Sequence, residues 1–342
     1  TMLNAGADIN AQTNNGRTIL MSLSIMSLNG DRIEVVKFCL KSGANPNLVD
    51  GFGEDALEHA RIRKDKAIYD LLKPITTPIE EKRAKLDGKF FKSDDVEIYY
   101  KVIGAKTGTP LFVLHGGPGF DHQYFLTNSV FGEFGKSRPI VFFDQRGSGN
   151  SPRLMEKQWA TLKDVTEDIE RLRLHLGFEK IDIFGHSWGG FLAMAYSVAY
   201  PQNMSRMIVC DSMHPVYGES VDLFEQKYPE INARRKEARN LALGDDVEAL
   251  RETLKLYMQM LFYSDKKRDE FISKSDNFRA NLYVGMDLQG SAEGTNLTES
   301  LKKTNFPTLI LHGRHDDNIT LDTPKDIQKT IPKSEFIIFE ES

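Results

Sequence analysis

The chain has 342 residues, of which 40% are hydrophobic and 27% are charged, and its formal net charge is −5. This length accommodates about two domains of ordinary size. The small negative charge gives no reason to expect nucleic acid or an anionic membrane as a partner, and no apolar run approaches the ~18 residues of a membrane-spanning helix. The two cysteines, Cys39 and Cys210, lie far apart in apolar runs. We therefore expect buried thiols rather than a disulfide, which is typical of a cytoplasmic protein.

The first segment of the chain contains an internal repeat. Residues 6–10 (GADIN) are echoed by residues 43–47 (GANPN), and residues 33–40 and 67–72 are amphipathic helical runs. This pattern resembles the ankyrin repeat, whose period is ~33 residues, with a few residues inserted at 24–28. Stacked repeats need about three units or more, so either further repeats precede Thr1 or these units pack on the next domain, and we favour the first. The resemblance implies either a surface that binds a protein partner or a stabilising appendage.

From residue 88 onward the pattern predicts strands that alternate with helices. Residues 89–93 and 96–102 favour an opening antiparallel pair, and residues 162–176 have helical spacing of leucine and isoleucine. The apolar runs typical of buried parallel strands are 111–114, 140–143, 181–184, 207–210, 308–311 and 335–339. The pattern predicts an α/β fold with a mostly parallel eight-strand sheet and helices on both faces.

A candidate nucleophile lies directly after the strand predicted at 181–184. Residues 185–190 read GHSWGG and precede an apolar helical run. Glycine on each side of Ser187 allows a sharp turn where a Cβ would clash, which is typical of a strand-to-helix elbow that exposes a serine. The backbone N–H of Trp188 would then lie beside the Ser187 hydroxyl.

Three further loops follow predicted strands, at the edge where open parallel sheets place their ligands. Residues 115–119 (HGGPG) supply backbone N–H groups, and Gly117 is the candidate to form an oxyanion hole with Trp188, beside Gly116. Residues 144–152 begin with Asp144 and Arg146, which we expect to hold neighbouring loops through charge-assisted hydrogen bonds. A carboxylate in residues 313–317 (GRHDD) is placed to orient a catalytic histidine.

The combination HGGPG, DQRGSG and GHSWGG resembles the proline iminopeptidase group of α/β-hydrolases, over residues 89–342. The resemblance implies an α/β-hydrolase fold with a helical cap, and it selects Asp316 as the acid of the triad. It also implies that acids bind the free amine of a peptide substrate. Asp317 is one candidate for this role, or else a solvated loop acid, and Asp287 is a candidate in the cap. No cofactor is implied.

The family order requires a histidine after the acid, and none of the eight histidines follows Asp316. His312 and His315 flank the acid on its own strand end and form an H-x-x-H pair, but without a third ligand we expect no metal site. The sequence ends directly after the last predicted strand, where the family continues with Gly-His. We therefore expect the chain to be a fragment at both ends, with weak activity by itself.

These patterns divide the chain into ankyrin-like repeats (1–73), a linker (74–87), a hydrolase core (88–212 and 305–342) and a helical cap (213–304). The predicted function is a serine hydrolase, of the aminopeptidase type, that releases N-terminal residues from peptides. The alternatives are a carboxylic-ester hydrolase and a non-catalytic interaction protein with a hydrolase fold.

Overall fold

The computed structural model describes residues 6–13, 16–25, 32–51, 53–126, 130–155, 158–243, 247–274 and 280–342. The chain forms two compact units. The first comprises Thr1–Asp87, Arg153–Gln158 and Glu237–Thr253, and the second comprises Gly88–Pro152, Trp159–Lys236 and Leu254–Ser342. Among the described residues, no helix combines the length and the apolar character needed to span a bilayer.

Short paired helices make up the first part of the first unit. They are α1 (Ile19–Ile25), α2 (Arg32–Lys41), α3 (Ala56–Ile62), α4 (Lys66–Leu72), the 3₁₀ turn η2 (Lys73–Ile75) and α5 (Ile79–Arg83). Helix α1 packs against α2 and α3, and α4 packs against α2 and α3. Their shared core includes Val36, Ala60 and Ile68, none of which is exposed to solvent.

The sequence repeat of this unit is also a repeat of backbone conformation. Gly6 and Gly43, at equivalent positions, have φ values of 88° and 91°, in the left-handed region that favours glycine. The Asn10 side chain accepts a hydrogen bond from the backbone N–H of Asn45 at 2.7 Å, and Asn47 accepts one from Thr77 at 2.6 Å. Asn10 and Asn47 occupy equivalent positions of the repeat, and each connects its own turn to the segment that follows. Most of the insertion expected at 24–28 lies outside the described residues.

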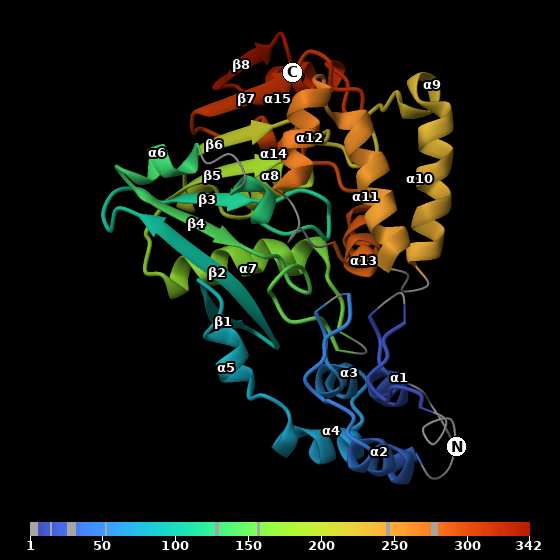
Figure 1. The fold of residues 1–342 in the computed structure, drawn as a ribbon. Coiled ribbons are helices and arrows are strands. Elements are labelled where there is room, and N and C mark those ends of the chain that lie inside the picture. Colours follow the sequence, from blue (N-terminus) through green and yellow to red (C-terminus); the bar gives the residue numbers. More distant parts are fainter. Residues whose placement is uncertain are drawn as a thin grey trace. The chain divides into compact units, whose positions relative to one another are not determined.

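The second unit is built on one eight-strand sheet (Figure 1). Its strands are β1 (Lys89–Ser93), β2 (Val96–Gly104), β3 (Leu111–Leu114), β4 (Pro139–Phe143), β5 (Ile181–His186), β6 (Met204–Cys210), β7 (Thr308–Gly313) and β8 (Ser334–Phe339). They lie in the order β1-β2-β4-β3-β5-β6-β7-β8. The pairs β1–β2 and β2–β4 are antiparallel, and all later pairs are parallel. The predicted mostly parallel sheet is confirmed.

The remaining helices and turns are η3 (Gln123–Phe125), α6 (Phe131–Gly135), α7 (Leu162–His175), α8 (Trp188–Ala199), η4 (Pro201–Asn203), α9 (Phe224–Lys227), α10 (Pro229–Ala242), α11 (Val247–Leu261), α12 (Asp265–Ser273), α13 (Leu282–Ala292), α14 (Thr298–Leu301) and α15 (Asp322–Thr330). Helix α8 packs against β3, β5 and β6, while α6 packs against β2 and β4. Every residue of β3 and β4 is buried. Continuous apolar runs are expected where helices cover a parallel sheet on both faces.

Helix α7 shows how local sequence defines an element. The Thr161 hydroxyl accepts from the backbone N–H of Asp164 at 3.1 Å, and the Asp164 carboxylate accepts from that of Thr161 at 3.1 Å. This reciprocal capping box satisfies two N–H groups that the helix itself leaves without partners. It fixes the start of α7. Asp168 of this helix binds a loop beside the candidate site, as described below.

Candidate active site

Ser187 lies at the junction of β5 and α8 with φ 57° and ψ −121°. A Cβ on Gly185 would lie 2.1 Å from the carbonyl oxygen of Gly189, and a Cβ on Gly189 would lie 2.2 Å from that of Leu114. Real Cβ atoms do not approach backbone oxygens so closely, so both positions require glycine. The steric argument made from the sequence is confirmed. The left-handed backbone of a non-glycine residue stores strain that the surrounding packing must hold.

Gln145 connects the three loops that follow β3, β4 and β5. Its backbone N–H donates to Nε2 of His115 at 3.0 Å, and its side-chain amide donates to the His115 carbonyl at 2.9 Å. The indole N–H of Trp188 donates to the Gln145 side-chain oxygen at 3.0 Å. Burial lowers the pKa of His115 to about 4, so the ring is neutral and its Nδ1–H donates to the Gly116 carbonyl at 3.0 Å.

Tyr124 makes a second connection, between the glycine loop and the serine elbow. Its hydroxyl accepts from the backbone N–H of Gly116 at 2.7 Å and donates to Nδ1 of His186 at 3.0 Å. Since Gly116 and His186 directly precede Gly117 and Ser187, one hydroxyl joins the segments that carry the candidate oxyanion donor and the candidate nucleophile. The Gly116 N–H is therefore engaged by Tyr124.

The loop after β4 is held by its charged residues, as expected. Asp144 accepts hydrogen bonds from the backbone and the ring of His122 at 2.9 and 2.7 Å. Arg146 donates twice to the buried carboxylate of Asp168, with both distances 2.8 Å. A bidentate arginine–carboxylate pair fixes orientation as well as distance, so this loop is anchored to α7.

Asp316 and Asp211 lie close together at the ends of β7 and β6. The Asp316 carboxylate accepts from the backbone N–H groups of Asn318 and Ile319 at 2.8 and 2.9 Å. Asp211, with φ 44°, accepts from the N–H of Gly313 at 3.0 Å. Burial, followed by the negative charge of Asp211, raises the pKa of Asp316 to about 6.

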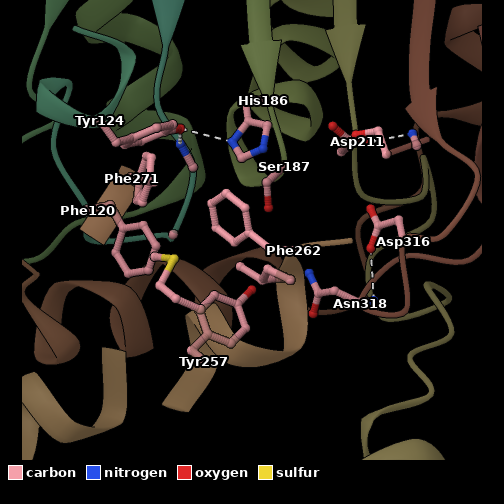
Figure 2. A pocket seen from close by; sticks show the side chains of 16 residues that line it. Phe120, Tyr124, His186, Ser187, Asp211, Tyr257, Phe262, Phe271, Asp316 and Asn318 are labelled. Carbon is pink, nitrogen blue, oxygen red and sulfur yellow. Dashed lines mark hydrogen bonds between the residues drawn. The ribbon is translucent and has the colours of Figure 1, made fainter. Parts of the chain in front are cut away.

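These residues share a cavity of about 230 Å³ (Figure 2). Ser187, Gly116, Gly117, Asp211, Asp316 and Asn318 line it, together with a set of apolar and aromatic side chains. That set is Phe120, Tyr124, Tyr257, Met258, Leu261, Phe262 and Phe271. Figure 2 shows Phe120, Tyr124 and Phe271 on one side of Ser187, and Asp211, Asp316 and Asn318 on the other. The cavity thus has an aromatic end and an acidic end, with the serine between them.

The two candidate amine-binding acids lie outside this cavity wall. Asp317 is buried and pairs with Lys227 at 2.6 Å and with the Tyr228 hydroxyl at 3.0 Å. Asp287, on α13, accepts a hydrogen bond from the backbone of Ala160, and burial raises its pKa. Neither lines the cavity. The structure therefore brings together Ser187, Gly116, Gly117 and Asp316, with Trp188 next in the chain, and it does not bring Asp317 or Asp287 to them.

The sequence reasoning did not identify Asp211 or Tyr124. Asp211 directly follows the buried strand β6, so the same strand-end argument that selected Asp316 could have found it. Tyr124 lies in an irregular loop after Gly116. No feature of the sequence indicates that its hydroxyl reaches both the glycine loop and the serine elbow.

Comparison with known proteins agrees with this architecture. Residues 109–342 match the family described as "alpha/beta hydrolase fold", and residues 15–51 match the ankyrin repeat. A proline iminopeptidase of Saccharolobus solfataricus is 31% identical over 264 residues, covering 72% of this chain and 83% of the relative. A proline iminopeptidase of Thermoplasma volcanium is 28% identical over 273 residues, covering 75% of this chain and 90% of the relative.

Solved structures share the fold at lower identity. An alpha/beta fold family hydrolase from Bacillus anthracis has a TM-score of 0.61 at 23% identity, covering 75% of this chain and 91% of that chain. An esterase from Exiguobacterium antarcticum has a TM-score of 0.57 at 22% identity, covering 74% and 91%. This chain therefore belongs to the alpha/beta hydrolase fold family, carries an ankyrin repeat ahead of the hydrolase region, and has proline iminopeptidases among its relatives.

Proposed function

We propose that the chain is a serine hydrolase in which Ser187 attacks a substrate carbonyl. The observation that carries the proposal is the strained elbow, which presents Ser187 to a cavity that Gly117 and Asp316 also line. In this mechanism the Ser187 oxygen bonds to the carbonyl carbon, a general base takes its proton, and the backbone N–H groups of Gly117 and Trp188 stabilise the oxyanion. Asp316 orients the base and stabilises its positive charge.

The base is assigned to none of the eight histidines of this sequence. His186 is hydrogen-bonded to Tyr124, His312 to the carbonyl of Ile319, and His115 to Gly116 and Gln145. His315 stacks on Tyr263. None of the described contacts joins a histidine to the Ser187 hydroxyl, so the proposal assigns the roles of Ser187, Gly117, Trp188 and Asp316 and leaves the base unassigned.

Two substrate classes follow from different observations. The proline iminopeptidase relatives support an aminopeptidase that releases N-terminal residues from peptides. The aromatic end of the cavity supports hydrolysis of an ester with an uncharged acyl group. A substrate amine is positively charged when protonated, so it needs a carboxylate partner when it is buried away from water. An apolar acyl group is instead stabilised by burial among aromatic side chains.

The test is covalent labelling of the natural gene product, including any residues that follow Ser342, with a fluorophosphonate probe. We expect labelling of the wild-type protein and none of Ser187→Ala, because the probe reacts only with an activated serine. Labelling that survives the substitution would refute Ser187 as the nucleophile. Absence of labelling in a folded wild-type protein would favour the non-catalytic alternative.

The substrate class is then decided with prolyl, leucyl and alanyl arylamides beside short-chain aryl esters. Each arylamide is paired with its N-acetylated form, which has the same acyl group without the positive charge. Preference for the free amine supports the aminopeptidase, whereas equal or faster turnover of blocked and ester substrates supports the esterase.

A further inference from the structure

A buried histidine nitrogen without a hydrogen-bond partner lies behind the two acids of the cavity, among the residues that the structure describes. His312 is 1% exposed, and its Nε2–H donates to the Ile319 carbonyl at 2.7 Å. In the neutral ring the proton therefore lies on Nε2, and Nδ1 carries a lone pair. Among the described residues Nδ1 has no hydrogen-bond partner, and it lies 3.5 Å from the Asp211 carboxylate.

Two carboxylates from separate strands lie beside this ring, Asp211 next to Nδ1 and Asp316 with its Oδ2 3.6 Å from Nε2. Asp211 follows β6, Asp316 follows β7, and one ligand atom from each lies within 4.8 Å of the other and of His312. No lysine or arginine is among the described residues that line the cavity. The Asp211 carboxylate and the Nδ1 lone pair repel each other, as do the two carboxylates, and a bound cation removes this repulsion.

We propose that Asp211, His312 and Asp316 form a binding site for a divalent transition-metal ion, with Zn²⁺ as the ion that the ligand set fits. One imidazole nitrogen and two carboxylate oxygens are ordinary zinc ligands, at distances of ~2.0–2.2 Å from the ion. Two ligands of a tetrahedral zinc ion are then ~3.4 Å apart, and His312 Nδ1 and Asp211 Oδ1 already lie 3.5 Å apart. The cavity beside Asp211 and Asp316 leaves the fourth position to water.

The surrounding hydrogen bonds hold the ligands in this arrangement. The Ile319 carbonyl fixes the tautomer of His312, as acceptors hydrogen-bonded to the far nitrogen of a ligating histidine do in zinc sites. The Gly313 N–H holds Asp211, and the N–H groups of Asn318 and Ile319 hold Asp316. The Asp316 carboxylate, whose Oδ2 lies 3.6 Å from Nε2, must turn toward Nδ1 to close the site.

The site has a consequence for catalysis that rests on the proposed function. An Asp316 carboxylate that coordinates zinc no longer orients the general base of Ser187. Zinc therefore acts as a reversible inhibitor that competes with the catalytic arrangement for one side chain.

The test is calorimetric titration of the metal-stripped natural protein with ZnCl₂, supported by the visible absorption of bound Co²⁺. We expect one equivalent of zinc in the wild type and an affinity reduced about tenfold or more in His312→Gln and in Asp211→Asn. Glutamine can keep the donor to Ile319 while removing Nδ1, and asparagine can keep the acceptor for Gly313. The matched control is His315→Gln, which removes an exposed histidine of the same loop and should leave the affinity unchanged.

Absence of zinc binding in the wild type, or undiminished binding in both His312→Gln and Asp211→Asn, overturns the site. If His312→Gln does not fold, Asp211→Asn decides alone. Fluorophosphonate labelling is measured in parallel with chelator and with zinc. Labelling in chelator tests the proposed function independently of the metal. Zinc that binds without slowing the labelling supports the site and overturns its inhibitory role.

Discussion

Tyr124 joins, through one hydroxyl, the two segments that carry the candidate oxyanion donor and the candidate nucleophile. It is half-buried at the cavity wall, and loss of water around its hydroxyl raises its pKa well above the usual value, so it stays protonated and remains a donor to His186. Because its two partners directly precede Gly117 and Ser187, movement of either segment changes the distance between oxyanion donor and nucleophile. We regard Tyr124 as a positioning residue.

Replacing Tyr124 with phenylalanine should lower kcat by about tenfold or more while changing KM little, because misplacement of the donors is felt most in the transition state. The same change leaves the buried N–H of Gly116 without a partner, which costs about 1–3 kcal/mol of stability. The control is Tyr228→Phe, which removes a hydroxyl that donates to Asp317 outside the cavity wall. If both variants lose kcat equally, or if Tyr124→Phe changes only KM, the positioning role is wrong.

At the scale of elements, the junction of β5 and α8 depends on close backbone approach. The first turn of α8 lies against the ends of β3 and β6, where Gly189 meets the Leu114 carbonyl and Gly190 meets Ser212. Gly189 and Gly190, in the first turn of this helix, therefore allow its backbone to lie close to the sheet. They are not a helix-forming signal, since glycine disfavours helix by ~1 kcal/mol.

Substitution of Gly189 with alanine should destabilise the protein by roughly 3 kcal/mol or more, because its Cβ would meet backbone that cannot move aside. A matched glycine lies in α13, where a Cβ on Gly290 would meet nothing within 4 Å. Gly290→Ala should stabilise by about 0.5–1 kcal/mol. The measurement is urea unfolding, and a Gly189→Ala protein as stable as the wild type would refute the close approach.

Much of the fold could be predicted from sequence because its signals are local. Buried strands such as β3 and β4 appear as unbroken apolar runs, and the turns of the repeat carry glycine where φ is positive. The candidate site could be predicted only in part. Ser187 and Asp316 lie at strand ends within recognisable motifs, whereas the pairing of Asp317 with Lys227 joins segments whose relative position no local pattern encodes.

At the scale of the whole molecule, the two units have separate hydrophobic cores. The core of the first unit is drawn from residues of α1 to α4 and the turns between them, and a core of the second from β3, β4 and α6. Both tryptophans, Trp159 and Trp188, belong to the second unit. Tryptophan fluorescence therefore follows the second unit, while far-UV circular dichroism follows both.

Replacing Ile68, which is fully buried in the first core, with alanine should destabilise the first unit by about 2–5 kcal/mol. In urea, the circular dichroism of Ile68→Ala should begin to change at a lower concentration than in the wild type, while the tryptophan transition stays in place. Val113→Ala, in the second core, is the control and should shift the tryptophan transition. A tryptophan transition that shifts equally in Ile68→Ala would show that the two cores unfold as one.

The sequence by itself determined the ankyrin repeat, the mostly parallel sheet and the elbow of Ser187, because periodicity, apolar runs and glycine positions act over a few residues of chain. Only the tertiary structure decided what surrounds the serine. It placed Asp211 beside Asp316, left the Nδ1 of His312 beside Asp211, and brought the Tyr124 hydroxyl between two loops. The physical reason is that these contacts join the ends of different strands, and their energies depend on burial and charge that exist only after the sheet has assembled.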